Sequence, residues 1–337
     1  MKTLVTGGAG FIGSELVRQL AEAVGHVTVV DNLVNGRKEH LAGLPPEQLR
    51  LEVEDIRDTA RMAELMHGVQ IVFHLACLGV RHSIHSPKEN HDVNATGTLD
   101  LLAVARKADV KRFVYVSSSE VYGTAKFVPM KEEHPTFPMT VYGAAKLAGE
   151  CYTRAYHSTY GYPTVVVRPF NSYGPRCHHE GDSGEVIPKF LLRSMAGKPM
   201  VVFGDGTQTR DFTFVSDTAR GIVAAGMAGD AIGQTINLGQ GSEISINELA
   251  AAIQRVVGRP DASIIHEPPR PGDVLRLYAD STRARQLLGF QTSVTLSTGL
   301  AKLKQWYDQL DTQPEQLLKD EVTHNWQHPE SGRHAQD

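Results

Sequence analysis

The stretch YGAAK holds a tyrosine and a lysine, Tyr142 and Lys146, whose spacing would let them act together as a base. Residues four apart lie on one face of a helix, so the ammonium group is expected beside the phenol. A free tyrosine has a pKa near ~10, and a neighbouring cation favours the phenolate and lowers that pKa. The pair therefore predicts proton abstraction, although Tyr-x-x-x-Lys alone is a common pattern that usually carries no function.

The stretch VSSSEVYG at 116–123 places three serines and one acid, Glu120, at the end of an apolar run. A serine hydroxyl there could contact the same substrate oxygen as Tyr142. If the segment is extended, the side chains of Ser118 and Glu120 project the same way, and Glu120 faces whatever Ser118 faces. The alternative is that Glu120 pairs with an arginine or caps a turn.

A glycine-rich stretch, TGGAGFIG at 6–13, follows the first apolar run and opens an amphipathic segment. Gly7, Gly10 and Gly13 are three residues apart. Small residues permit a tight turn and let backbone N–H groups at a helix N-terminus approach a pyrophosphate. By itself this motif is weak, because a glycine-rich turn can be only a turn.

Two acidic residues follow the next two strand-like runs. Asp31 comes 18 residues after Gly13, where a carboxylate can accept hydrogen bonds from ribose hydroxyls and repel a 2′-phosphate. This favours NAD over NADP, although the nearby Arg37 keeps NADP open. Asp55 could reach an adenine amine, or it could cap the helix that follows it.

The elements that must position these residues alternate along the chain. Amphipathic segments at 12–23, 90–107 and 142–159 lie between apolar runs at 4–6, 27–31, 71–76, 112–118 and 164–169. Continuous apolar strands alternating with helices predict an α/β fold with a parallel sheet covered on both faces. After residue 170 the pattern loosens, with helical stretches at 186–197 and 245–257 and short strands near 200–203 and 235–238. We predict a first domain at 1–170, a smaller α/β lobe at 171–312 from which some segments return to the first domain, and a polar, frayed tail at 313–337.

Composition excludes several classes of function. The net charge is −4 without a basic run, so no nucleic-acid or membrane partner is expected. No apolar run approaches the ~20 residues that span a bilayer, and no signal peptide is seen. Three scattered cysteines, Cys77, Cys151 and Cys177, favour a reducing cytoplasm over a disulfide framework. No metal site is expected, and the adjacent His178 and His179 are interpreted as solvated.

The motifs TGGAGFIG, HLA, SSSEVYG, YGAAK, RPFNSYGP, GDGTQTRDFTFVSD and RPGD occur in this order over roughly residues 1–310. In this the chain resembles the extended short-chain dehydrogenase/reductases, in particular the NAD-dependent nucleotide-sugar epimerase/dehydratase family, with similarity to UDP-glucose 4-epimerases. The resemblance implies a Rossmann-like, doubly wound sheet with a nucleotide-sugar lobe, NAD as cofactor and a nucleotide sugar as substrate. It also implies a homodimer formed through the helices at 90–107 and 142–159.

The resemblance assigns roles residue by residue. The catalytic set would be Ser118, Glu120, Tyr142 and Lys146, with Ser118 holding the sugar hydroxyl. The cofactor-binding set would be Gly7, Gly10, Phe11, Ile12, Gly13, Asp31, Asn32, Asp55, Ile56, Leu75 and Ala76, together with Tyr142 and Lys146. The substrate-binding set would be Ser118, Asn171, Val186, Phe203, Arg210, Arg270 and Asp273, with Phe203 near the nucleobase and the arginines near the diphosphate. Taken singly, Arg210 and Arg270 could be surface ion pairs of little worth, and Phe203 could be core.

Glu120 keeps three reactions open, all starting with oxidation of the sugar at C4. In the family, 4-epimerases usually carry a neutral residue here, whereas 4,6-dehydratases and decarboxylases usually carry Glu. Many dehydratases also place Asp before that Glu, where this chain has Ser119. The stretches RPGD, VLRLYAD and VIPKF resemble epimerases, and Leu277 falls at the position that gates sugar size. We place 4-epimerase first, 4,6-dehydratase second and UDP-glucuronate decarboxylase third, with an NAD-binding sensor or scaffold as the non-enzyme alternative.

Overall fold

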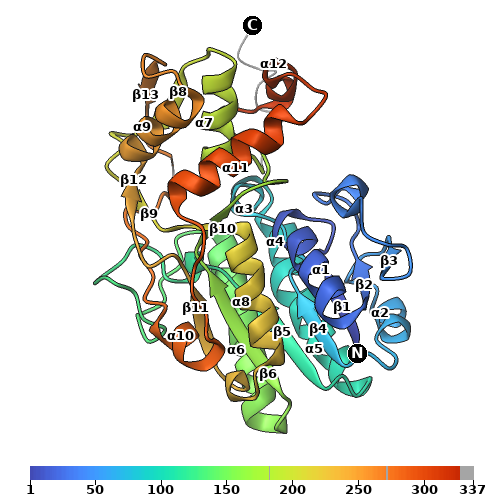
Figure 1. Ribbon diagram of the computed structural model, residues 1–337. Helices are drawn as coiled ribbons and strands as arrows, with labels where there is room; N and C mark the ends of the chain where they lie inside the picture. Colours follow the sequence, from blue (N-terminus) through green and yellow to red (C-terminus); the bar gives the residue numbers. More distant parts are fainter. Residues whose placement is uncertain (182, 271, 327–337) are drawn as a thin grey trace, which may run out of the picture.

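The computed structural model describes residues 1–181, 183–270 and 272–326. Its centre is a seven-stranded sheet in the order β11-β6-β5-β4-β1-β2-β3, and every neighbouring pair in it is parallel (Figure 1). The strands of this sheet are β1 (Lys2–Thr6), β2 (His26–Val30), β3 (Leu49–Glu52), β4 (Ile71–His74), β5 (Arg112–Val116), β6 (Thr164–Pro169) and β11 (Thr235–Leu238). The strand order reverses between β1 and β4, and ligands of such sheets bind outside the carboxyl ends of the strands at that point.

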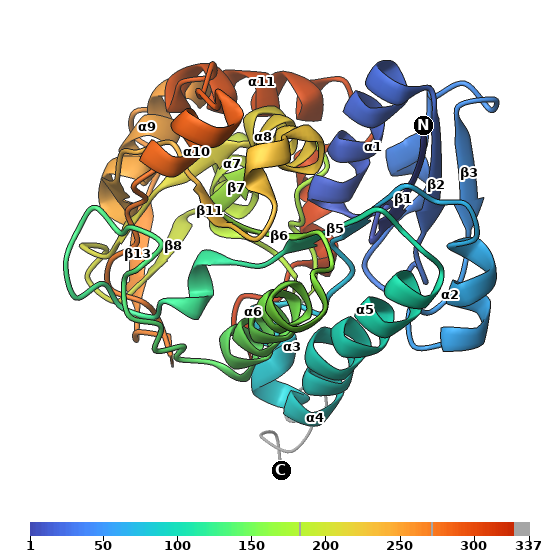
Figure 2. The ribbon, with the colours of Figure 1, turned by 90° about the horizontal axis from the view of Figure 1, so that it is seen from below.

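Helices lie on both faces of this sheet, as Figure 2 shows. The α-helices are α1 (Phe11–Val24), α2 (Thr59–Leu65), α3 (Val80–His85), α4 (Pro87–His91), α5 (Gly97–Lys107), α6 (Val141–Tyr160), α7 (Val186–Met195), α8 (Val215–Met227), α9 (Ile246–Val257), α10 (Thr282–Leu288), α11 (Leu296–Asp308) and α12 (Pro314–Leu317). A π-helical turn, Asp92–Thr96, joins α4 to α5, so the predicted helix at 90–107 is continuous but locally widened. Short 3₁₀ turns lie at Lys38–Leu41, Ser119–Val121, Gly229–Ala231 and Leu318–Asp320.

Two hydrophobic clusters, one on each face of the sheet, follow from the alternation of side chains along β1. Val5 packs with Leu16 and Leu20 of α1 and with Ile222 of α8. Leu4, which points to the other face, packs in a cluster with α2 and α5. The predicted α/β fold with a sheet covered on both faces is therefore confirmed.

The second lobe is built on three two-stranded pairs. These are β7 (Asn171–Tyr173) with β10 (Phe212–Phe214), β9 (Thr209–Arg210) with β12 (Ile244–Ser245), and β8 (Met200–Phe203) with β13 (Ile264–Glu267). Its own core joins apolar side chains of α7, α9 and α11, such as Leu191, Leu249 and Leu303. In Figure 1 the lobe lies above the upper ends of the strands of the large sheet.

Two features of the structure add to or correct the sequence prediction. The prediction had some segments return to the first domain without naming them, and the strand near 235–238 is one: it is β11 and pairs with β6 as the edge strand of the large sheet. The chain thus returns to the first domain, and α8 packs against α1 there. The tail is ordered as far as Trp326: α12 lies against α7, and Leu318 and Asn325 are buried. Positions 327–337 of the predicted tail lie outside the described residues.

Among the helices that the structure describes, none combines the length and the apolar character needed to cross a bilayer.

Candidate active site

A cavity of about 600 Å³ lies at the carboxyl ends of the strands and is lined by both lobes. All of the catalytic, cofactor-binding and substrate-binding residues expected from the sequence line it. From the first domain these are Gly7, Gly10, Phe11, Ile12, Gly13, Asp31, Asn32, Asp55, Ile56, Leu75, Ala76, Ser118, Glu120, Tyr142 and Lys146; from the second lobe they are Asn171, Val186, Phe203, Arg210, Arg270 and Asp273. The predicted residues are thus brought together, while their individual roles stay predictions.

The glycine-rich turn between β1 and α1 needs its glycines for space. Gly7 has φ +71, and a Cβ there would approach the backbone nitrogen of Ala76 to 2.7 Å. A Cβ on Gly13 would overlap the carbonyl oxygen of Gly7. Gly10 is the N-cap residue of α1 and supplies no side-chain cap, so the N–H groups of the first turn face the cavity without a side-chain acceptor. This is the arrangement that binds a phosphate at a helix N-terminus.

Asp31, at the end of β2, is fixed by its surroundings. Its carboxylate accepts hydrogen bonds of 2.9 Å from the backbone N–H groups of Ala9 and Leu33. Burial raises the pKa of Asp31, and these hydrogen bonds oppose the rise. Arg37, which left NADP open, forms an ion pair of 2.6 Å with Glu180. A cation that is already paired is a poorer ligand for a 2′-phosphate, which favours the NAD interpretation.

Asp55 does not cap a helix. Asp58 caps α2, accepting a hydrogen bond from the backbone of Arg61. Asp55 instead pairs with Arg57 at 2.7 Å and accepts a hydrogen bond from Asn32. The hydrogen bond from Arg57 lowers the pKa of Asp55 to about 2. Because Asp58 occupies the N-cap position, the capping alternative for Asp55 is wrong. Asp55 also lines the cavity.

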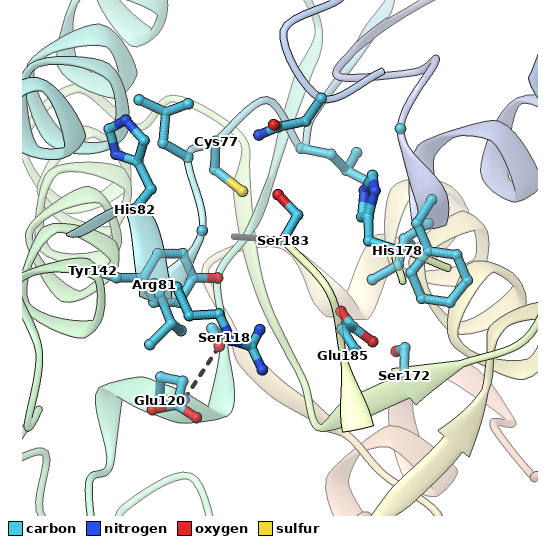
Figure 3. Close-up of a pocket in the computed structure, with 18 of the residues that line it drawn as sticks. Cys77, Arg81, His82, Ser118, Glu120, Tyr142, Ser172, His178, Ser183 and Glu185 are labelled. Carbon is cyan, nitrogen blue, oxygen red and sulfur yellow. Dashed lines mark hydrogen bonds between the residues drawn. The ribbon is translucent and has the colours of Figure 1, made fainter. Parts of the chain in front are cut away.

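Ser118, Tyr142 and Lys146 meet where β5 ends and α6 begins. Ser118 and Tyr142 both line the cavity, and Figure 3 shows the two side chains near one another in it. Lys146 is buried, and its Nζ donates to the carbonyl oxygen of Val116 at 2.6 Å. The three side chains therefore converge, as the sequence predicted.

The expected lowering of the tyrosine pKa is wrong for this structure. Burial raises the pKa of Tyr142 well above its usual value, and the hydrogen bond with Ser118 opposes that rise. Burial also lowers the pKa of Lys146, whose ammonium is bonded to a backbone carbonyl. Desolvation of the phenol thus outweighs the cation one helical turn away.

Glu120 reaches the cavity by a different route from the one expected. Residues Ser119–Val121 form a 3₁₀ turn, and the Ser118 hydroxyl caps it by accepting a hydrogen bond of 3.2 Å from the Glu120 N–H. The premise of an extended segment is therefore wrong, yet Figure 3 shows Ser118 and Glu120 beside one another in the cavity. Throughout the residues that the structure describes, no arginine or lysine lies within ion-pair distance of Glu120. The arginine-pairing alternative is also wrong.

On the side of the second lobe, two guanidinium groups share one carboxylate. Arg210 and Arg270 each lie 2.6 Å from an oxygen of Asp273. Arg210 is only 7% exposed, so this is not a surface ion pair. The cluster keeps one positive charge in excess, which suits a diphosphate. Asn171 adds a buried carbonyl oxygen with no hydrogen-bond partner among the described residues.

One position is placed away from the cavity. Leu277, taken as the gate for sugar size, is fully buried among Tyr122, Val274 and Ala279. It is not part of the cavity lining, so this expectation is wrong.

Two charged residues of the cavity, Arg81 and Glu185, were missed, and His178 was misinterpreted. Arg81 of α3 projects between Tyr142 and Glu120 in Figure 3; burial lowers its pKa to about 10, and its Nε has no partner among the described residues. Glu185 faces the cavity from the second lobe, and burial raises its pKa. His178 lines the cavity, and its Nδ1 lies 3.5 Å from Oε1 of Glu180. The interpretation of His178 as solvated is therefore wrong. Arg81 belongs to the predicted loop CLGVRHSIHSP at 77–87, which the resemblance places at the sugar pocket, so the charge in that loop was the available signal.

No group of histidine, cysteine and acidic side chains suited to a metal ion occurs in 1–181, 183–270 or 272–326.

The parallel sheet, the uncapped helix N-terminus and the acid at the end of β2 define a Rossmann-like nucleotide-binding protein. A family model described as GDP-mannose 4,6 dehydratase matches residues 4–303. The chain belongs to the NAD-dependent epimerase/dehydratase family of extended short-chain dehydrogenase/reductases, whose members are enzymes acting on nucleotide sugars.

Several relatives extend over nearly the whole chain. A UDP-glucose 4-epimerase of Mycolicibacterium smegmatis is 41% identical over 315 residues, which cover 91% of this chain and 98% of the relative. The structure of a UDP-glucose 4-epimerase of Thermotoga maritima with UDP-glucose has a TM-score of 0.86 and 33% identity, and covers 91% of this chain and 99% of its own. The structure of a dTDP-glucose 4,6-dehydratase of Streptomyces venezuelae with NAD bound has a TM-score of 0.86 and 34% identity. The match covers 91% of this chain and 97% of that one.

Proposed function

We propose that this protein is an NAD-dependent nucleotide-sugar 4-epimerase that acts through a transient 4-keto sugar. The observation that carries the proposal is the convergence of Ser118, Tyr142 and Lys146 on a cavity lined by both lobes, with Lys146 one helical turn after Tyr142. The identity of 41% to a UDP-glucose 4-epimerase supports the choice among reactions.

The residues present fit NAD. The N–H groups at the start of α1 would hold the pyrophosphate, and the Asp31 carboxylate would accept from the adenosine ribose. Lys146 would contact the nicotinamide ribose. When bound, NAD supplies the means to accept a hydride from the sugar and to return it.

The chain's own residues handle the proton and the sugar. Tyr142, as phenolate, would take the proton of the C4 hydroxyl, and Ser118 would hold that oxygen in line. The excess positive charge of Arg210, Arg270 and Asp273 would hold the diphosphate. Turning the ketone over before the hydride returns would invert C4 without any further acid or base.

The second candidate is a 4,6-dehydratase, and Glu120 favours it. A C4 ketone acidifies the C5 proton, and a carboxylate without an ion-pair partner in the same cavity could remove that proton while the C6 hydroxyl, protonated by an acid, leaves as water. Return of the hydride to C6 and of a proton to C5 would complete the dehydration. Against this, the residue before Glu120 is Ser119, which is buried and is a much weaker acid for the leaving water. We therefore keep 4-epimerase first.

The test is incubation of the full chain with UDP-, dTDP-, CDP- and GDP-sugars, read by mass spectrometry and proton NMR. An unchanged mass with a new C4 stereoisomer supports epimerisation. Loss of 18 mass units, roughly one water, means dehydration, and loss of about 44 means decarboxylation; either result overturns the first choice.

Substitution of Glu120 by Gln sharpens the test. An epimerase variant should retain turnover within about tenfold, whereas a dehydratase that uses this carboxylate as base should lose about 10²–10⁴-fold. Glu133→Gln is the matched control, because Glu133 is exposed and lies outside the cavity lining.

We also propose a homodimer formed through α5 and α6. These helices pack side by side and lie on the outer side of one face of the sheet (Figure 2).

A further inference from the structure

The chain continues beyond residue 303, where the match to the family model ends. Residues 320–326, called here the C-terminal strap, fold back onto the second lobe. Because the strap lies outside the matched region, the family description gives it no role.

An ion pair and a hydrogen bond hold the strap against α7. Arg193 forms an ion pair of 2.9 Å with Glu321, and both side chains are largely buried, with exposed fractions of 14% and 7%. Lys189, one turn earlier, donates to the carbonyl oxygen of Val322 at 2.7 Å. A shielded ion pair of this kind fixes the position of the strap more firmly than an exposed one would.

The strap is also fastened to the loop that precedes α7. The Gly181 N–H donates to the carbonyl oxygen of Asp320 at 2.8 Å. The Asn325 side chain, which is buried, donates to the carbonyl oxygen of Gly184 at 3.1 Å. The next residue, Glu185, lines the main cavity, so the strap supports one wall of that cavity.

The strap ends in an aromatic contact at the site. The rings of Trp326 and Phe203 meet edge to face, with centroids 4.8 Å apart and planes at 82°. His324 lies 5.9 Å from the same phenyl ring and forms an ion pair of 2.7 Å with Glu267 of β13. Phe203 lines the main cavity, so the strap adds two further rings beside it.

A second cavity of about 80 Å³ borders the strap. It is lined by Thr323, Asn325 and Trp326, and it shares Phe203 and Arg270 with the main cavity. One water needs about 10–15 Å³ in this measure, so the space exceeds that of a single water. Arg270 and Phe203 therefore line both spaces, and Trp326 lines the smaller one.

We propose that the strap forms the outer wall of the nucleobase subsite, with Trp326 and Phe203 as the aromatic surfaces that contact the base. Resting on the proposed function, a diphosphate at Arg270 directs its nucleoside toward Phe203 and Trp326. Aromatic side chains bind bases by stacking with any base, so the wall contributes affinity more than choice of base. Loss of Trp326 weakens nucleotide binding and leaves NAD in its own part of the cavity undisturbed.

The experiment measures binding of UDP, dTDP, CDP and GDP to the full chain by calorimetry and then uses the nucleotide that binds most tightly. Trp326→Ala should raise its Kd about tenfold, and Trp326→Phe, which keeps a ring, should restore most of the affinity. Val322→Ala, an exposed position on the same strap, and a chain that ends at Trp326 should both bind within about twofold of the full chain. The Kd for NAD should stay within about twofold in every variant.

A second readout uses fluorescence. The chain has two tryptophans, so Trp306→Phe leaves Trp326 as the only one. Added nucleotide should change Trp326 emission in this folded variant, and this result decides the matter if Trp326→Ala does not fold. Unchanged emission on saturation, or a Trp326→Ala Kd equal to that of the full chain, overturns the role of the strap alone. If none of the four nucleotides binds the full chain, the proposed function falls.

Discussion

Tyr142 is held between two opposing influences. Burial disfavours the phenolate, and the hydrogen bond with Ser118 favours it. Lys146 does not resolve the balance here, because its ammonium is bonded to the Val116 carbonyl oxygen. A base in this position works only when a further positive charge, or the reacting hydroxyl itself, stabilises the phenolate.

Tyr142→Phe should therefore lower kcat by about 10²–10⁴-fold, because the variant keeps the ring and loses the proton acceptor. NAD binding, followed by calorimetry, should be unchanged within about twofold. Tyr160→Phe is the matched control, since Tyr160 lies on the same helix and is 52% exposed. A near-normal kcat for Tyr142→Phe would remove this tyrosine from the mechanism.

Asp31→Asn should weaken NAD about tenfold and narrow the preference for NAD over NADP. The change removes the charge that repels a 2′-phosphate and keeps an oxygen that can accept from Ala9 or Leu33. Kd values for both dinucleotides measure it, with the exposed Asp109→Asn as control. Equal selectivity in Asp31→Asn and the unaltered chain would show that Asp31 does not contact the ribose.

Residue types and spacing were enough to place every predicted residue except Leu277 on one cavity, because the glycine turn, the strand ends and the i, i+4 pair depend on local geometry. Arg81 and Glu185 were beyond that reasoning. The loop before α3 takes its course from Asn94, whose side chain bonds both the N–H and the carbonyl oxygen of Leu78. Such contacts between distant segments leave no periodic signal in the sequence.

At the scale of elements, a buried ion pair joins β6 to α6, the helix that carries Tyr142 and Lys146. Arg168 of β6 and Glu150 of α6 lie 2.6 Å apart, with side chains 4% and 0% exposed. The Ser117 hydroxyl donates to the same carboxylate at 2.6 Å. The pair therefore fixes α6, which carries Tyr142 and Lys146, against the strand end that carries Ser118.

Arg168→Met should lower the free energy of unfolding by about 3–5 kcal/mol, because it leaves a buried carboxylate without its main partner. Arg154→Met is the control: Arg154 contacts the same carboxylate at 2.8 Å but is 37% exposed, so it should cost no more than about 1 kcal/mol. Denaturant unfolding measures both. A cost for Arg168→Met as small as that of the control would show that the pair is not needed.

The loss of stability in Arg168→Met should depend on pH in a defined direction. In the unaltered chain Arg168 lowers the pKa of Glu150, so this contribution to stability is present above the unfolded pKa and is lost as the pH falls. In Arg168→Met, burial dominates and raises the pKa of Glu150. Protonation of Glu150 then removes the buried, unpaired charge and so reduces the loss of stability. The stability gap should narrow as the pH falls from about 8 to 5. A gap that stays constant over this range would assign the loss to packing.

Elements with strong periodicity, such as α1 and α6, were predicted to within a residue or two, because their apolar faces must meet the sheet. A return of some segment to the first domain was predicted, but not that β11 would be that segment, and the ordered position of the strap was not predicted. β11 is as apolar as a strand of either lobe, and its place is decided by pairing with β6. The polar strap is held by ion pairs and hydrogen bonds, which composition does not distinguish from a solvated tail.

At the scale of the whole molecule, the reactivity of Cys151 can report on whether the proposed homodimer forms through α6. This residue is exposed on α6, whereas Cys77 is half-buried and Cys177 is buried with a raised pKa. A thiol reagent should therefore react first with Cys151 in a monomer. If α6 lies in the interface, Cys151 should react slowly in the dimer and faster on dilution.

Cys151→Arg should convert a dimer of twice the 36.9 kDa chain mass into a monomer, because the interface cannot bury an unpaired guanidinium without a large cost. Met227→Arg is the matched control: Met227 is a partly exposed apolar residue of α8, on the opposite face of the sheet, and its change should leave the dimer intact. Sedimentation velocity distinguishes the species. A dimer that survives Cys151→Arg and dissociates in Met227→Arg would place the interface on α8 and α1, and a monomeric unaltered chain would end the proposal of a dimer.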